Sequence, residues 1–147
     1  MFKLILSFIL LLMSFQSLHA DEYFLTLRND KVNLRLGPSF EYPIKLFYKK
    51  KFLPVLVQEK SENFRKVRDH ENNTGWIHIS QLSKKKAAIV IDNNSYVYSS
   101  NTIYSRPIAI SEAGKLLLIK KCKKKWCKIS AGEIKGWIKK ETLWGLL

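Results

Sequence analysis

The two cysteines, Cys122 and Cys127, are the most reactive side chains in this sequence. A catalytic cysteine needs a thiolate beside a general base, and a zinc site would need two further ligands at matching spacing. Beyond position 20 the only histidines are His70 and His78, and no pair of acids has a spacing that indicates glycosidase chemistry. Each cysteine is explained more simply by the other, as a disulfide that closes a hairpin. We therefore expect no catalytic residues, no metal and no cofactor.

Residues 1–20 have the layout of a secretory signal. Lys3 supplies a positive charge, residues 4–15 form an almost unbroken apolar run, and Ala20 is the small residue at the predicted cut. A helix that crosses a bilayer needs about twenty apolar residues, so this run predicts a cleaved signal-peptide helix and no stable membrane anchor afterwards. An uncleaved anchor is the minor alternative and stays open. Export to an oxidising compartment favours the disulfide between the two cysteines.

The charge of the chain has two interpretations, and both stay open. The formal net charge is +14, and lysine outnumbers arginine by 21 to 5. A basic surface attracts phosphates and anionic polymers through long-range forces that salt weakens. Alternatively, an AT-rich genome places lysine wherever a charged surface residue is tolerated. The lysines gather in four runs: Lys49–Lys51, Lys84–Lys86, Lys120–Lys121 and Lys123–Lys125.

One short pattern occurs twice in the chain. Gly75-Trp76-Ile77 and Gly136-Trp137-Ile138 lie 61 positions apart, and a short alternating segment that opens with an aromatic residue precedes each of them. A repeat of this length is the size of a small domain. After the signal peptide at 1–20, the repeat predicts a first domain at 21–83, a polar lysine linker, and a second domain at 87–147.

Alternation of apolar and polar residues predicts short strands throughout both halves. Residues 32–36 alternate well, and no stretch after the signal keeps a helical period over ten residues. Short strands between frequent turn signals are typical of small β-barrels. We therefore predict an all-β chain of two tandem barrels. Domains of about sixty residues are marginally stable alone, so we expect the barrels to pack together or to use the cross-link.

The first half resembles the bacterial SH3-like (SH3b) domain family. The resemblance rests on the segment from Val32 to Pro38, on Tyr42-Pro43, and on Gly75-Trp76-Ile77-His78 followed by Leu82. The second half is more divergent, because Ser95–Ser99 lacks the Asn-x-Arg-x-Gly-Pro phrase, but its close resembles the tandem form found in exported proteins of Gram-negative bacteria. The resemblance implies five-stranded barrels in the periplasm or at the cell wall. Structural roles are expected for Gly37, Pro38, Gly75, Gly136 and Trp137.

The resemblance also implies a role in targeting the cell wall. Peptidoglycan stems carry free carboxylates, which suit a lysine-rich barrel with aromatic loops. We therefore expect a periplasmic, non-enzymatic binding module that holds peptidoglycan or another anionic wall component. The candidate ligand-binding residues are Arg35, Phe40, Tyr42, Trp76, Tyr104 and Trp126, and core packing is the main expected role of Trp76 and Trp137.

The main alternative is a periplasmic adaptor that binds another envelope protein through a strand edge or the seam between the barrels. Proline-rich peptides are a weaker hypothesis, because Glu41 is the only acid in the loop that would meet ligand arginines. The charge permits binding of nucleic acid, but export removes that partner. The sequence gives no indication of the oligomeric state.

Overall fold

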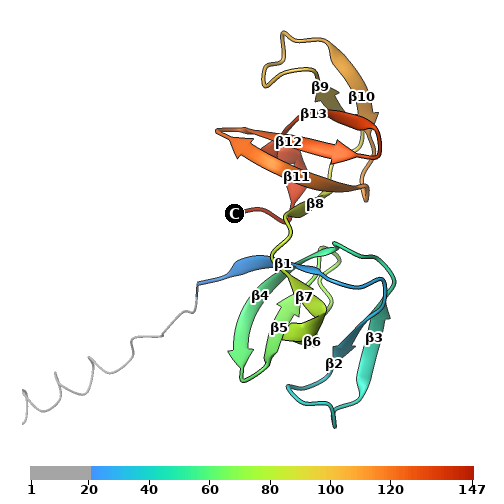
Figure 1. Ribbon diagram of the computed structural model, residues 1–147, viewed down its shortest axis with the longest axis vertical. Helices are drawn as coiled ribbons and strands as arrows, with labels where there is room; N and C mark the ends of the chain where they lie inside the picture. The colour runs from blue at the N-terminus through green and yellow to red at the C-terminus, as the bar shows by residue number, and fades with distance from the viewer. Residues whose placement is uncertain (1–20) are drawn as a thin grey trace, which may run out of the picture.

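The computed structural model describes residues 21–147, and the predicted signal peptide lies outside these residues. The described chain forms two small β-barrels stacked end to end (Figure 1), which confirms the predicted all-β fold. The first barrel contains β1 (Tyr23–Leu27), β2 (Val32–Arg35), β3 (Ile44–Tyr48), β4 (Pro54–Ser61), β5 (Phe64–Arg68), β6 (Thr74–His78), the 3₁₀ turn η1 (Ile79–Gln81) and β7 (Leu82–Ser83). The second contains β8 (Ala87–Val90), β9 (Ser95–Tyr98), β10 (Pro107–Ser111), β11 (Leu116–Lys123), β12 (Trp126–Ala131), β13 (Ile134–Lys139), η2 (Lys140–Thr142) and β14 (Leu143–Trp144).

The two barrels share one topology. The strand order is β3-β2-β6-β5-β4-β1-β7 in the first sheet and β10-β9-β13-β12-β11-β8-β14 in the second. The second order is the first with every strand number raised by seven, so the sequence repeat corresponds to a structural repeat. Each sheet has seven strands, two more than the resemblance implies, because β1 and the two-residue β7 extend the first sheet beyond β4. Strands β8 and β14 do the same in the second sheet.

Strand β2 shows how alternation builds the core. Val32 and Leu34 are fully buried, whereas Asn33 and Arg35 are only half-buried. Burying one such aliphatic side chain contributes roughly 1.5–3 kcal/mol. Each barrel has its own apolar cluster. Among residues 21–147, no helix is long and apolar enough to cross a membrane.

The disulfide between Cys122 and Cys127 is present. The two residues are direct partners in the β11–β12 ladder, and their Cα atoms lie 4.0 Å apart. The predicted cross-link is therefore confirmed, and it closes the two-residue turn at Lys124 and Lys125. On the chain-entropy model a ring this short contributes about 2 kcal/mol.

The seam between the barrels is apolar and tightly packed. Ile89 of β8, in the second barrel, is 1% exposed and belongs to the core cluster of the first barrel. Trp144 of β14 meets Phe24 of β1 edge to face, with ring centroids 4.9 Å apart. The following Gly145 has φ of 120°, and a Cβ there would lie 2.8 Å from the Cβ of Pro54 in the first barrel. The predicted packing of one barrel on the other is therefore observed.

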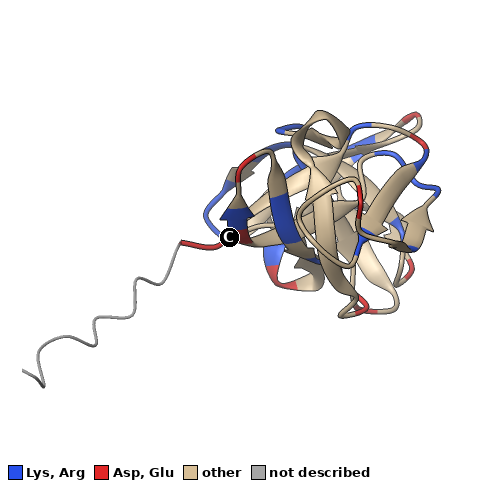
Figure 2. Cartoon of the chain, turned by 90° about the horizontal axis from the view of Figure 1, so that it is seen from below, with Lys and Arg blue, Asp and Glu red and all other residues tan. Residues whose placement is uncertain are grey.

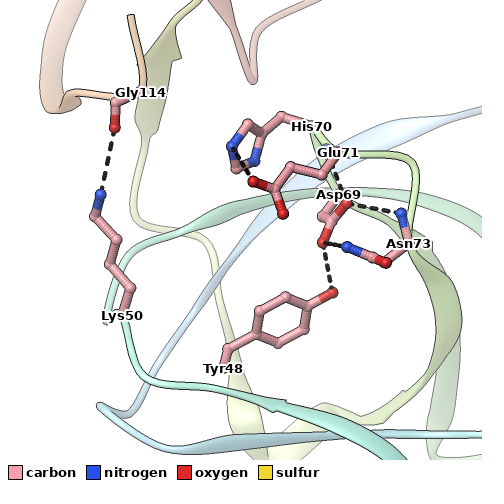
Figure 3. A network of polar contacts seen from close by, with 7 residues as sticks. All are labelled: Tyr48, Lys50, Asp69, His70, Glu71, Asn73 and Gly114. Carbon is pink, nitrogen blue, oxygen red and sulfur yellow. Dashed lines mark hydrogen bonds and ion pairs between the residues drawn. The ribbon is translucent and has the colours of Figure 1, made fainter.

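A buried carboxylate organises the turn between β5 and β6, on the side of the first barrel that faces the second (Figure 3). Asp69 is 1% exposed, and its two carboxylate oxygens accept hydrogen bonds from the backbone N–H groups of Glu71 and Asn73, from the Asn73 amide and from the Tyr48 hydroxyl, at 2.8–3.0 Å. Burial and the neighbouring Asp69 carboxylate raise the pKa of Tyr48 well above its ordinary value. Nearby, the Lys50 ammonium donates to the carbonyl of Gly114 across the seam.

Candidate functional site

An aromatic cluster covers one end of the first barrel. The loop between β2 and β3 places Phe40 against Phe64 and His78, with ring centroids 5.2 Å and 5.0 Å apart. Phe64 opens β5, and His78 closes β6 directly opposite it in the ladder. The His78 ring also caps η1, because its Nδ1 accepts the N–H of Ser80. Phe40 remains 64% exposed, so the cluster presents one aromatic face to solvent.

Arg35 fixes the loop that carries Phe40. Its guanidinium donates to the carbonyls of Phe40 and Tyr42, at 3.2 Å and 2.9 Å, and its Cζ lies 5.4 Å from the Phe40 ring centroid. The Tyr42 ring lies over Gly37, where any Cβ would overlap it, and Pro38 is half-buried in the same loop. The structure therefore brings the candidate binding residues Arg35, Phe40 and Tyr42 together. The Arg35 guanidinium already forms two hydrogen bonds within the loop, however, and those donors are not free for a ligand.

The second barrel builds the equivalent place differently. Trp126 opens β12 as Phe64 opens β5, and Tyr98 of β9 takes the position of Arg35. The rings of Tyr98 and Trp126 meet edge to face at 5.5 Å. Ser105 holds the loop in place of a guanidinium, with its hydroxyl 2.7 Å and 3.1 Å from the carbonyl oxygens of Thr102 and Ser100.

A cavity of about 740 Å³ separates this loop from the hairpin. The indole of Trp126, which is half-buried, forms part of its wall. The hairpin is joined to η2 by a hydrogen bond from the backbone N–H of Lys140 to the carbonyl of Lys125, so two walls of the cavity are connected. The lining residues are Asn101, Thr102, Ile103, Lys124, Lys125, Trp126, Lys139, Lys140, Glu141 and Leu146.

The lining of this cavity is basic and partly apolar. Four lysines line it against one acid, Glu141. The Lys139 ammonium lies 3.8 Å from the Glu141 carboxylate, while Lys124 and Lys125 extend from the hairpin turn with exposed side chains. An apolar wall with a few charged groups is typical of a ligand site. The Lys139 ammonium lies beside Glu141 and the Lys140 ammonium donates to the main-chain oxygen of Leu147, so Lys124 and Lys125 are the lysines that would meet the carboxylates or phosphates of a ligand.

The two repeated tryptophans lie beside these sites within the sheets. Trp76 pairs with Arg35 and Lys66, and Trp137 is half-buried with the Lys121 ammonium 5.8 Å from its ring centroid. The glycine before each tryptophan lies where two antiparallel strands pair, β6 with β2 in the first barrel and β13 with β9 in the second. A Cβ at Gly75 would come within 2.6 Å of Leu34, and one at Gly136 within 2.6 Å of Val97.

Tyr104 is the candidate that lies apart from the others. It is 92% exposed at the tip of its loop and is not among the residues that line the cavity. Sequence reasoning assigned no binding role to Phe64, to His78 or to the lysines of the cavity. Aligning the two repeats supplies the missing signal, because Phe64 and His78 then coincide with Trp126 and Lys139.

No metal site is visible in the described part of the chain. Within residues 21–147, no three His, Cys, Asp or Glu side chains come together in a group that could hold a metal ion.

Comparison with curated proteins gives no significant match. Among solved structures, NlpC1 of Trichomonas vaginalis is similar at 15% identity and a TM-score of 0.38, over 90% of this chain and 49% of that one. NlpC2 of the same organism is similar at 14% identity and a TM-score of 0.39, over 84% of this chain and 48% of that one. This chain thus spans about half the length of each.

The family comparison covers both barrels. The model of the bacterial SH3 domain matches residues 28–84 and again residues 97–145, which together make up most of the chain. The match covers the loop with Phe40 in the first barrel and the hairpin with Trp126 in the second. Two matched copies on one repeated topology lead to a single conclusion: the chain belongs to the bacterial SH3 domain family.

Proposed function

We propose that this chain is an exported binding module of the bacterial envelope that holds peptidoglycan, and that it catalyses no reaction. The observation that carries the proposal is the cavity of about 740 Å³ in the second barrel, whose lining includes a half-buried indole and four lysines. Peptidoglycan stem peptides combine small aliphatic side chains with free carboxylates. The aliphatic groups would pack on Trp126 and Ile103, and the carboxylates would meet Lys124 and Lys125.

Two features support binding without chemistry, in an oxidising compartment. Both cysteines are consumed by the disulfide, so neither supplies the thiolate that a cysteine nucleophile requires. Disulfides persist mainly outside the cytoplasm, and the pattern of residues 1–20 has the features of a secretory signal. The disulfide and the signal-like pattern of residues 1–20 support a protein that acts in the periplasm.

Sedimentation of residues 21–147 with purified murein sacculi tests the proposal. The protein is expected to pellet with the sacculi at low salt and to be released as the salt concentration rises, because its charge pairs are screened. Trp126→Ala should weaken binding about tenfold or more, since a tryptophan that a ligand covers is a typical binding hot spot. The double variant Lys124→Glu, Lys125→Glu should also weaken binding about tenfold or more. It should leave the packing of the barrel unchanged, because both side chains are exposed.

Tyr104→Ala is the matched control, because Tyr104 lies in the same loop region but does not line the cavity. Its binding should equal that of the unaltered protein. The proposal fails if the protein stays in the supernatant at every salt concentration. It also fails if both cavity variants pellet as well as the control.

A further inference from the structure

A second cleft, of about 690 Å³, lies at the seam between the barrels. Its walls come from β1, from the connector of residues 84–86 and from β11, and the last three residues of the chain lie along it. Figure 1 shows β1 and β11 on either side of the marked C-terminus. The lining residues are Tyr23, Phe24, Leu25, Thr26, Lys84, Lys85, Lys86, Ala87, Ile119, Lys120, Lys121, Cys122, Lys140, Gly145, Leu146 and Leu147.

The charge of this cleft is one-sided. Six lysines line it, and none of its lining side chains is a carboxylate. Figure 2 shows basic segments close to the marked C-terminus, together with the acidic start of the described chain at residues 21–22, which does not line the cleft. The Lys140 ammonium donates to the main-chain oxygen of Leu147 at 2.8 Å, whereas Lys84, Lys85 and Lys86 are exposed. A concave surface that carries one sign of charge attracts ligands of the opposite sign.

Two strand edges border the cleft, and both begin at the lysine connector. The connector follows β7, whose Ser83 pairs with Thr26, and Tyr23–Leu25 of β1 then have no ladder partner on that side within residues 21–147. On the other wall, the backbone N–H of Ile119 donates to the carbonyl of Lys86. Beyond it, Lys121 and Cys122 pair with β12 alone among the described residues, and Lys120 lies at a shift in the β11–β12 register. Such edges leave backbone N–H and C=O groups free to bind another strand.

We propose that this cleft binds an extended acidic segment of a partner protein by strand addition. A bound strand would satisfy the donors and acceptors along an edge in register, whereas a phosphate or a lipid headgroup has no alternating row of N–H and C=O groups to match them. Successive side chains of a strand point to opposite faces. An alternating acidic and aliphatic segment would therefore direct its carboxylates to the lysines and its aliphatic groups to the apolar floor around Phe24 and Ile119.

The test uses residues 21–147 and a fluorescent ten-residue peptide of alternating Glu and Val, with anisotropy as the measurement. Binding is expected, and replacement of every Glu by Gln should weaken it by about tenfold or more. The triple variant Lys84→Glu, Lys86→Glu, Lys120→Glu should lose binding to the same extent. The matched control makes the same charge change at exposed lysines that line neither cavity, Lys60→Glu, Lys115→Glu and Lys135→Glu, and should keep most of it.

Two further probes separate strand addition from simple charge attraction. A peptide N-methylated at alternate amides keeps its charge but loses one edge of donors, so it should bind about tenfold more weakly or worse. Equal binding of the methylated peptide would overturn the proposal. So would displacement of the peptide by phosphatidylglycerol vesicles that bind the cleft more strongly. Trp126→Ala should leave peptide binding unchanged, which distinguishes this site from the proposed wall site.

Discussion

The two barrels have equivalent strand orders. They differ in the space between the loop after β2 or β9 and the hairpin β4–β5 or β11–β12, which is filled in the first barrel and open in the second. In the first barrel the loop lays Phe40 on Phe64 and His78, so aromatic rings pack against one another. In the second barrel a cavity of about 740 Å³ lies between Ile103 of the loop and Trp126 of the hairpin. The difference shows that topology fixes where a site can form, while the loop residue decides whether it is filled.

The barrels also differ in how their hairpins are held. The β11–β12 hairpin carries the disulfide between Cys122 and Cys127, at the ladder position where the first barrel has Lys60 and Arg65. The turn after β5 depends instead on the buried carboxylate of Asp69. One barrel is thus fixed by a covalent bond and the other by a polar network, and each device can be removed separately.

The largest expected effect follows from Asp69→Ala. The substitution removes the acceptor of four hydrogen bonds and leaves the half-buried Tyr48 hydroxyl and two backbone N–H groups without a partner. A hydrogen bond to a charged group contributes about 1.5–3 kcal/mol, and these bonds do not add fully. We therefore expect the free energy of unfolding to fall by about 3–4 kcal/mol, as measured by urea denaturation.

The corresponding turn of the second barrel provides the control. There Gly132 adopts φ of 60° with nothing within 4 Å of a Cβ, so Gly132→Ala meets backbone strain but no lost network. A cost of about 1 kcal/mol is expected. If Asp69→Ala costs no more than Gly132→Ala, the polar network does not hold the first barrel.

The next effect comes from removing the disulfide. The double variant Cys122→Ala, Cys127→Ala should lose about 2 kcal/mol of unfolding free energy. The reverse change, Lys60→Cys with Arg65→Cys, should gain less than this, because the Arg65 guanidinium gives up its bonds to the carbonyls of Glu62 and Phe64. Urea midpoints with and without a reductant measure both changes. If the urea midpoint of the unaltered protein is the same with and without the reductant, the predicted contribution of the disulfide is wrong.

A smaller change exchanges the residues that fill the two loops. Ile103→Phe introduces an aromatic ring where the first barrel has Phe40, and it should fill part of the cavity of the second. Binding to murein sacculi is then expected to weaken about tenfold, or by about 1.4 kcal/mol. Phe40→Ile, in the first barrel, should leave binding unchanged. The opposite pattern would place the wall site in the first barrel.

The smallest effect is a pH dependence that Tyr48 gives to the first barrel. Burial and the Asp69 carboxylate raise the pKa of Tyr48 in the folded state, whereas an unfolded tyrosine has a pKa of about 10. The stabilisation is therefore complete below pH 10 and is lost progressively as the pH rises above it, because the unfolded chain then releases the tyrosine proton and the folded chain keeps it. Urea denaturation of Tyr48→Phe should lack this loss. An identical pH slope in both proteins would refute the assignment.

Much of the fold was predictable because its causes are local. Alternation in residues 32–36 gave strand β2, and the repeated Gly-Trp-Ile predicted two copies of one hairpin arrangement. The disulfide followed from two cysteines near enough to face each other across a turn. The buried role of Asp69 was not predictable, since a carboxylate in a polar turn gives the same sequence pattern whether it faces water or the backbone.

The candidate sites were harder to predict, because loops bring together residues that are distant in sequence. Trp126 lines the cavity, but Tyr104 extends into solvent although both are aromatic residues near the same loop. The lysine connector was expected as a solvated linker. Its side chains are exposed, but its backbone bonds both barrels, through Thr26 on one side and Ile119 on the other. Such contacts depend on tertiary packing that periodicity does not encode.

Ile89 belongs to the second barrel by sequence but lies in the core cluster of the first. A gene rearrangement that moved either half into another protein would leave an apolar socket open on one product and an exposed aliphatic side chain on the other. The two halves are therefore expected to be stable only as a pair. Truncation or domain-swapping strategies that treat either half as a portable unit should yield poorly soluble fragments.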